Sequence, residues 1–161
     1  MTNAIHEAGA TMEKSEQFRI RLRELFSEQA LAALATHQAG QPYANLVAFQ
    51  ASDDLRYIYF VTPKTTRKFA NLTADNRVAV MVNNSMNRDS DFHRAISVTA
   101  VGRATEVQGV DKEAALVKYL NKHGHLEDFA KAPTSALIRV TVETYYMVTN
   151  FQTVTELHLA L

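Results

Sequence analysis

Near the start of the chain, apolar residues recur at helical spacing. Four of them fall on one face of the segment Ser15–Glu28: Phe18, Leu22, Leu25 and Phe26. Charged residues occupy the other face, so the pattern predicts an amphipathic helix that lies on a core, with Ser15 as its N-cap. Residues 1–14 lack the basic start and the apolar run of a signal peptide, and we expect them to form a flexible leader.

After residue 30 the spacing changes to the alternation typical of strands. Seven strands are predicted: Leu31–Thr36, Tyr43–Gln50, Leu55–Val61, Arg77–Val82, Ala95–Val107, Ser135–Val142 and Tyr145–Val154. Turn residues separate the first three strands at Gln38–Pro42 and Ser52–Asp54, and Glu143-Thr144 is the predicted last turn. Gly102, inside the fifth strand, predicts a bend or a bulge.

Helical spacing returns over Arg67–Thr73 and Lys112–Asn121, and polar residues predict a loop over Asn83–His93. Almost every strand connection is too short for the crossover that a parallel pair needs, so the strands are expected to pair antiparallel. The predicted fold class is mostly β (α+β), an antiparallel barrel with peripheral helices. The chain has 161 residues, enough for one domain, which we place at residues 15–161.

The composition excludes several kinds of function. Seventeen Lys and Arg residues balance seventeen Asp and Glu residues, which argues against a broad nucleic-acid surface. Without cysteine there is no disulfide, thiolate metal site or cysteine nucleophile. No stretch reaches the roughly 18 apolar residues of a membrane helix, so no membrane partner and a cytoplasmic location are expected. The five glycines are too scattered for a dinucleotide or nucleotide phosphate loop.

The segment Thr62–Lys68 concentrates candidate chemistry, because it holds three cations, three hydroxyls and no acid. It joins the end of a predicted strand to the start of a helix, where free backbone N–H groups meet the positive end of the helix dipole. This combination is typical of a phosphate site. The simpler alternative is that Thr65 or Thr66 caps the helix and the cations are only solvated.

The preceding strand offers a place for the rest of such a ligand. Its middle lies between Tyr43 and Phe49 and consists of four residues: Asn45, Leu46, Val47 and Ala48. A flat aromatic ligand along this strand would hydrogen-bond to its backbone while a phosphate is held at residues 62–68. The alternative is that these four are ordinary core and rim residues.

Several segments carry a family pattern in a fixed order. They are Asn45–Gln50, Tyr59–Lys68 (Tyr-Phe-Val-Thr-Pro-Lys-Thr-Thr-Arg-Lys), Asn71-Leu72, Asp75–Val80 (Asp-Asn-Arg-Val-Ala-Val) and Val98–Glu106 (Val-Thr-Ala-Val-Gly-Arg-Ala-Thr-Glu). Together they resemble the pyridoxamine 5′-phosphate oxidase-like, FMN-binding split-barrel superfamily. The most specific piece is Thr-x3-Thr-Arg-Lys followed by the start of the Asp75–Val80 strand, and the resemblance covers roughly residues 20–155.

The resemblance implies an FMN site. The family strand that matches Asn45–Gln50 runs along the isoalloxazine, mostly through backbone contacts. Val61 and Thr62 match positions at the flavin and its ribityl chain. Three residues match those that hold the FMN phosphate: Thr66, Arg67 and Lys68.

The resemblance also implies contacts beyond this segment. Asn84 matches a polar position near the ribityl chain in some members, and Ser97 lies near the position of a glutamine that contacts flavin. The family forms homodimers with FMN at the subunit interface. Contacts from the partner chain would then come from later segments, around His123–His125 or Phe151.

The chain departs from pyridoxamine phosphate oxidases at two places. Its second strand has Asn45 where the oxidases have arginine, and no arginine follows Arg139, whereas the oxidases end in substrate-holding arginine and histidine residues. The resemblance is therefore to short FMN-binding, flavin-reductase-like members. It implies transfer of hydride or electrons from a reduced nicotinamide through FMN to a small acceptor. No residue is nominated as a catalytic acid, base or nucleophile.

Other residues allow rival hypotheses. His93 is an exposed side chain, a substrate acid or base, or a heme ligand, because some split-barrel relatives bind or degrade heme. His123 and His125 lack the convergent ligands of a metal site, so no metal is predicted. Tyr145 and Tyr146 are expected in the core or the dimer interface. The alternative functions are a non-catalytic flavin- or heme-binding protein (sensor, carrier or storage) and a structural dimer with an empty site.

Overall fold

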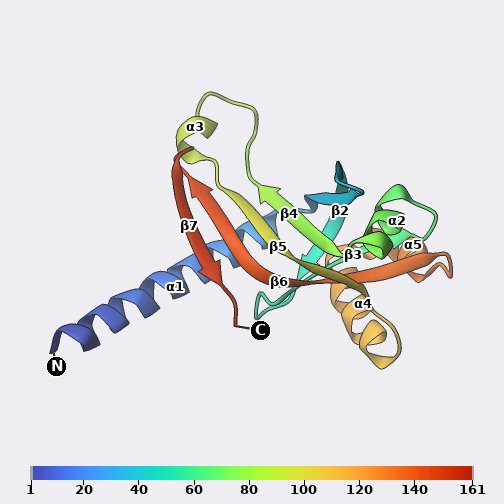
Figure 1. Ribbon diagram of the computed structural model, residues 1–161, viewed down its shortest axis with the longest axis horizontal. Coiled ribbons are helices and arrows are strands. Elements are labelled where there is room, and N and C mark those ends of the chain that lie inside the picture. The colour runs from blue at the N-terminus through green and yellow to red at the C-terminus, as the bar shows by residue number, and fades with distance from the viewer. Residues whose placement is uncertain (1, 161) are drawn as a thin grey trace.

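The computed structural model describes the backbone of residues 2–160 and the side chains of residues 12–160. Within this range the strands are β1 (Leu31–Gln38), β2 (Gln41–Ala51), β3 (Tyr57–Pro63), β4 (Arg77–Asn83), β5 (Ser97–Glu106), β6 (Ser135–Thr149) and β7 (Thr153–His158). The helices are α1 (Thr2–Glu28), α2 (Arg67–Ala74), α3 (Asp91–Arg94), α4 (Val110–Lys122), η1 (Gly124–Leu126) and α5 (Glu127–Lys131), and they surround the sheet (Figure 1). The mostly β fold class is confirmed.

The sheet closes into a barrel because its two ends meet. The strand order is β3-β2-β1-β4-β5-β6-β7, all pairs are antiparallel, and β3 also pairs with β6 from Tyr57 opposite Thr141 to Pro63 opposite Ser135. In the described residues six strands therefore form the barrel wall, and β7 extends the sheet beyond β6. The closure is incomplete, because β2 pairs with β3 only over Phe49–Ala51.

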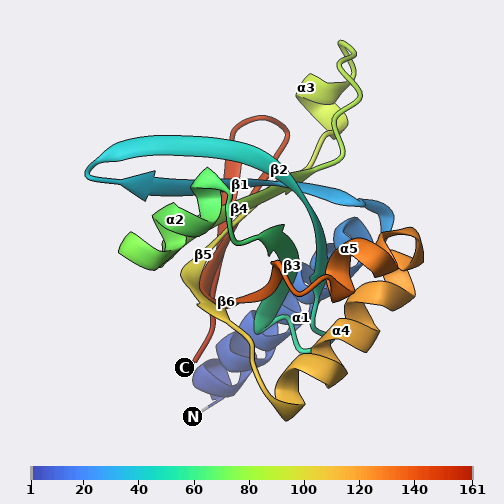
Figure 2. The same ribbon diagram turned by 90° about the vertical axis from the view of Figure 1, so that its right-hand side faces the viewer.

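The β1–β2 hairpin continues past this closure and projects from the barrel, with α2 beneath it (Figure 2). Its turn consists of Ala39 and Gly40, with φ angles of 49° and 80°. Left-handed backbone at both positions is typical of a two-residue hairpin turn, and glycine adopts it without strain. The hairpin strands are longer than predicted, because the tight turn leaves Gln38 and Gln41 paired with each other.

The predicted turn at Glu143-Thr144 is wrong, because β6 is continuous from Ser135 to Thr149. Val101 pairs with Thr144 and Gly102 pairs with Val142, so Glu143 is the extra residue of a β-bulge. Gly102 is required at this point, since a Cβ there would overlap the carbonyl oxygen of Thr141. Beyond the bulge β6 leaves β3 and pairs with β7, and the real turn lies between Thr149 and Thr153.

The first helix is longer than the pattern predicts. It begins at Thr2, so Ser15 lies inside α1 and the prediction of Ser15 as an N-cap is wrong. Alanines before Ser15 favour helix, and no proline interrupts them. The flexibility of residues 1–14 stays a prediction. Among the described residues no helix is both long enough and apolar enough to cross a membrane.

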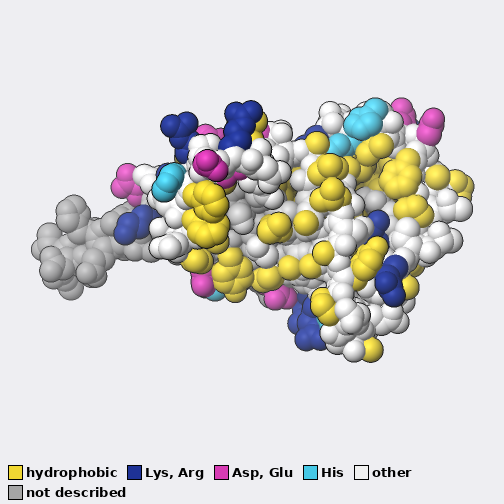
Figure 3. Space-filling view, turned by 90° about the horizontal axis from the view of Figure 1, so that it is seen from above, with side chains coloured by type: hydrophobic (Ala, Val, Ile, Leu, Met, Phe, Trp, Pro, Cys, Tyr) yellow, Lys and Arg dark blue, Asp and Glu magenta, His cyan; other side chains and the backbone are white. Residues whose placement is uncertain are grey.

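The outer face of the barrel carries an apolar row. Leu46 of β2 lies opposite Ala33 of β1, and Ala33 lies opposite Met81 of β4, so the three side chains point outward together. Leu46 is 65% exposed and Met81 is 39% exposed. Hydrophobic side chains are also visible among charged ones when the molecule is seen from above (Figure 3). Apolar surface of this kind is typical of a face that another protein covers.

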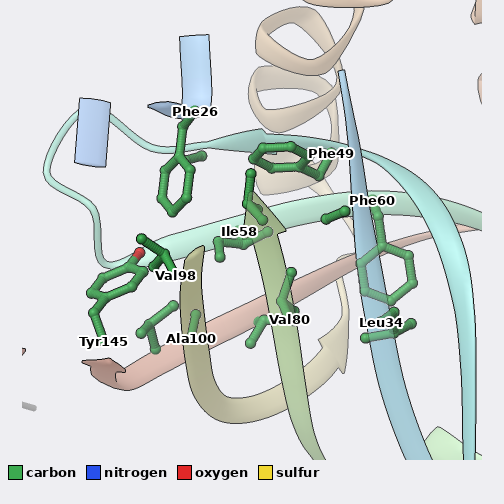
Figure 4. Close-up of a cluster of buried hydrophobic side chains, with 14 of the residues drawn as sticks. Phe26, Leu34, Phe49, Ile58, Phe60, Val80, Val98, Ala100 and Tyr145 are labelled. Atoms are coloured by element: carbon green, nitrogen blue, oxygen red, sulfur yellow. The ribbon is translucent and has the colours of Figure 1, made fainter. Parts of the chain in front are cut away.

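The core fills the barrel and the space between α1 and the strands that α1 covers. The predicted inner face of α1 is confirmed, because Phe18, Leu22, Leu25 and Phe26 are all buried. Figure 4 shows Phe26 beside Phe49 and Tyr145, and the ring centroids of Phe26 and Phe49 are 5.5 Å apart. The Tyr145 hydroxyl donates a hydrogen bond of 2.7 Å to the Leu55 carbonyl, so Tyr145 is a core residue with a satisfied polar end.

Candidate functional site

One edge of β2 is open along much of its length. Residues 41–48 pair with β1 on one side, but within residues 2–160 no strand pairs with their other side. Backbone N–H and C=O groups therefore remain available beside Asn45–Ala48, where the sequence predicted a ligand strand. Val47 points into the core, while Leu46 points outward.

The side chain of Asn45 points inward and carries an unsatisfied acceptor. Its Oδ1 atom is buried and accepts no hydrogen bond from the described residues. A buried oxygen without a partner is destabilising, because its interaction with water is lost and nothing replaces it. This oxygen would be satisfied by a ligand that donates a hydrogen bond.

The start of α2 lies next to this hairpin. Thr66 is the N-cap: its Oγ1 accepts from the Phe69 N–H at 3.4 Å and donates to the Pro63 carbonyl at 2.9 Å. Thr62 is fully buried, and its hydroxyl lies 2.9 Å from that of Thr66. The capping alternative is thus correct for Thr66, and Thr65 is not the cap.

Capping does not use all the donors of the first turn of α2. The N–H groups of Arg67 and Lys68 bond to no acceptor among the described residues. They lie at the positive end of the helix dipole, where an anion is stabilised. The cap and a phosphate site are therefore compatible at this helix end.

The three cations of the segment differ in their surroundings. Lys64 forms an ion pair of 2.7 Å with Glu106. Arg67 and Lys68 have no carboxylate partner in the described chain; the Arg67 guanidinium lies 5.4 Å from the centroid of the Tyr43 ring. Burial lowers the pKa of Lys68, because the ammonium group is partly removed from water. Arg67 and Lys68 remain available for an anion, whereas Lys64 is already neutralised.

Asn71, which the sequence showed only as part of the family pattern and with no predicted role, lies on α2 one turn beyond Arg67. Its side chain is buried, and its Nδ2 donates to the Thr36 hydroxyl at 2.9 Å, while its Oδ1 has no partner among the described residues. Besides its place in the family pattern, its signal in the sequence was an amide beside Leu72 on the apolar face of a short helix. Asn71 provides a second buried acceptor between α2 and the β1–β2 hairpin.

The other residues implied by the resemblance are not brought to the start of α2. The Val61 side chain is buried in a second core cluster with Tyr119 and Leu137, and Ala48 of β2 packs against this cluster. Asn84 lies at the far end of β4 from α2, about 20 Å along the strand. Its Oδ1 accepts from the Ile96 N–H at 2.7 Å. The assignment of Asn84 to the ribityl chain stays a prediction.

Ser97 and Phe151 do come together, at the end of β5 and the β6–β7 turn. They line a cavity of about 490 Å³ together with Asn83, Arg88 and Phe92. The Phe92 and Phe151 rings are 5.3 Å apart and both are largely exposed. The cavity lies on the outer side of the sheet, where Met81 of β4 also lines it.

The histidines are not arranged as a ligand set. His123 is buried, and its Nε2 lies 2.8 Å from the Phe49 carbonyl, to which it donates. Burial lowers the pKa of His123, so the ring is neutral at pH 7. His93 is exposed on α3. Among the described residues no group of three or more possible ligands converges on a metal position.

Comparison with known proteins identifies the family. A family model described as pyridoxamine 5′-phosphate oxidase matches residues 18–149. Among curated proteins no match was found.

Solved structures show the same fold at low sequence identity. A heme binding protein from Mycobacterium smegmatis has a TM-score of 0.73 and 15% identity, covering 83% of this chain and 55% of its own. Campylobacter jejuni ChuZ has a TM-score of 0.76 and 14% identity, covering 89% and 60%. A FAD-binding protein from Mesorhizobium loti has a TM-score of 0.66 and 19% identity, covering 80% and 90%. The chain thus spans little more than half the length of the first two proteins.

Proposed function

The chain belongs to the pyridoxamine 5′-phosphate oxidase family of split-barrel proteins, and from that premise we propose that it is an oxidoreductase that binds FMN non-covalently. Bound FMN would supply the redox chemistry, taking hydride from a reduced nicotinamide and reducing a small acceptor. The observation that carries the proposal is the start of α2, where, in the described chain, Arg67 and Lys68 have no carboxylate partner and two backbone N–H groups have no acceptor.

Arg67 and Lys68 would hold the FMN phosphate. Arginine offers two parallel donors to phosphate oxygens and lysine offers a compact charge, and the two free N–H groups add donors along the helix axis. Thr66 fixes the position of this turn through its cap. These contacts bind the phosphate and do not take part in electron transfer, so they contribute affinity rather than rate.

The two unsatisfied oxygens support a ligand with hydroxyl groups. Asn45 Oδ1 and Asn71 Oδ1 are buried acceptors, and a ribityl chain carries hydroxyl donors. Thr62, which is also buried, adds a hydroxyl beside the α2 cap. The donor and acceptor types of the site therefore fit FMN.

The open edge of β2 would position the ring. Backbone N–H groups beside Asn45–Ala48 are available to donate to ring oxygens and to stabilise negative charge on the reduced ring. Leu46 and Ala48 add apolar contact. No side chain is proposed as an acid or a base, because the electron transfer itself needs none from the chain.

We also propose that the protein is a homodimer with FMN near the interface. The apolar row Leu46, Ala33 and Met81 borders the open edge of β2, and a second copy of the chain would cover it. The cavity at Ser97 and Phe151 opens on the same outer side of the sheet, so the partner would contribute its residues to the site.

An absorption spectrum of the purified protein, followed by titration with FMN and with hemin, tests the proposal. Flavin bands with stoichiometric FMN binding, bleached by NADH or NADPH, are expected. Flavin binding without bleaching would favour the sensor, carrier or storage alternative. A Soret band after hemin addition that is lost in His93→Ala, with no flavin binding, would overturn the proposal in favour of heme.

A further inference from the structure

A separate cavity of about 610 Å³ lies between the end of α1, the end of β2 and α4. Figure 2 shows α4 on the side of the barrel away from α2, and Lys122 of α4 bonds to the carbonyl of Phe26 at the end of α1. Gln50, at the end of the strand that the resemblance matches to the flavin ring, is one of the lining residues, but none of the groups proposed above to hold FMN lines this cavity. The volume is in the range of small-molecule sites, which run from about 300 to 1,000 Å³.

Positive charge predominates on the wall of this cavity. Arg23, Lys118 and Lys122 line it together with one acid, Asp53. Lys118 lies 3.7 Å from the Asp53 carboxylate, which is almost fully exposed. The Arg23 guanidinium donates to the Asp53 carbonyl at 3.2 Å and reaches Glu16 at 3.4 Å.

Lys122 differs from the other two cations because no described carboxylate pairs with it. Its Nζ donates one hydrogen bond of 2.6 Å to the Phe26 carbonyl and lies 4.1 Å from the centroid of the Phe49 ring. An ammonium group has three donors, so two remain beside the cavity. Burial lowers the pKa of Lys122 to about 8, as expected for a charge removed from water without a counter-charge.

The remaining wall is mixed: Phe26, Ala51 and Leu55 are apolar, and Ser27, Gln50, Ser52 and Asn121 are polar but uncharged. A ligand that suits this wall combines an anionic head for the cations with a small body that carries both apolar and polar atoms. We propose that this cavity binds a small organic anion, a carboxylate or a phosphate ester, with Lys122 as the principal charged contact and Lys118 as a second. The anion supplies the counter-charge that the described chain lacks at Lys122.

Phenyl phosphate and benzoate are suitable probes, with benzyl alcohol as the neutral analogue. Binding is measured by NMR of the lysine Cε–H and phenylalanine ring signals in the Arg67→Ala/Lys68→Ala variant. This background removes the proposed FMN phosphate site, so failure of one proposal does not entail failure of the other. Saturable shifts of the Lys122 and Phe26 signals with either anion, and a rise in the pKa of Lys122, are expected.

Variants identify the contact. Lys122→Gln should weaken binding at least tenfold, and Lys131→Gln, which removes an exposed lysine of α5 paired with Glu127, should leave it unchanged. Because Lys122 also bonds to the end of α1, Lys118→Gln provides a second test that keeps this bond and should weaken binding several-fold. Three results would overturn the inference: benzyl alcohol binding as tightly as the anions, NMR shifts confined to residues outside the cavity, or unchanged anion affinity in both Lys122→Gln and Lys118→Gln.

Discussion

Replacing Arg67 and Lys68 together by alanine removes the two cations at the start of α2 that have no acid partner in the described chain. A hydrogen bond to a charged group contributes about 1.5–3 kcal/mol, so the two contacts to phosphate contribute about 3–6 kcal/mol. The Kd for FMN should therefore rise by about 10²–10⁴.

The same replacement should leave the fold intact. Arg67 is exposed, and its contact with the Tyr43 ring at 5.4 Å contributes about 0.5–1 kcal/mol. Burial already disfavours the charged form of Lys68, as its lowered pKa indicates, so removing that charge is not strongly destabilising. The free energy of unfolding should change by about 1 kcal/mol or less.

Two measurements on the same samples separate affinity from stability: quenching of FMN fluorescence and urea unfolding. Lys64→Ala is the matched control, because Lys64 belongs to the same segment but is paired with Glu106, and its FMN affinity should stay within about threefold of the wild type. Wild-type affinity in a folded double variant would refute the phosphate assignment. If the double variant unfolds, the stability argument is wrong and Arg67→Ala alone tests the affinity.

Three further predictions concern the barrel and its surface. Gly102→Ala should destabilise the protein by about 3 kcal/mol or more in urea unfolding, since its Cβ overlaps the Thr141 carbonyl; wild-type stability would mean that the bulge relaxes freely. Met81→Glu should yield monomers in light scattering if a second copy covers the outer face; an unchanged mass would exclude that face. Stability should fall as the pH drops below about 6.5, because the unfolded chain binds a proton that His123, whose pKa is lowered by burial, does not; His123→Gln should reduce this dependence.

Much of the fold could be predicted because its signals are local. The helix predicted at Arg67–Thr73 begins where α2 does, since Thr66 supplies the cap. The bulge expected at Gly102 is present, but the sequence could not show that β6 continues through Glu143. β6 is continuous because it changes its pairing partner from β3 to β7. The spacing of apolar residues within β6 gives no sign of this change.

In the candidate site, too, the features formed by neighbouring residues could be predicted and the contacts between distant residues could not. The cations and hydroxyls of Thr62–Lys68 are neighbours in the sequence, so a phosphate site could be predicted from them. The ion pair that neutralises Lys64 joins it to Glu106, 42 positions later, and the bond from Asn71 reaches back 35 positions to Thr36. Neither pairing has a local period or motif, so neither could be predicted.

By itself, the sequence determined the alternation of strands, the inner face of α1 and a cationic helix start, because each depends on neighbours within a few positions. Only the tertiary structure decided that, among the described residues, Arg67 and Lys68 have no carboxylate partner, one edge of β2 stays open and the half-buried Lys122 has no carboxylate beside it. Each of these depends on which distant segments the barrel closure brings together, and burial then determines the free energy of every polar group left without a partner.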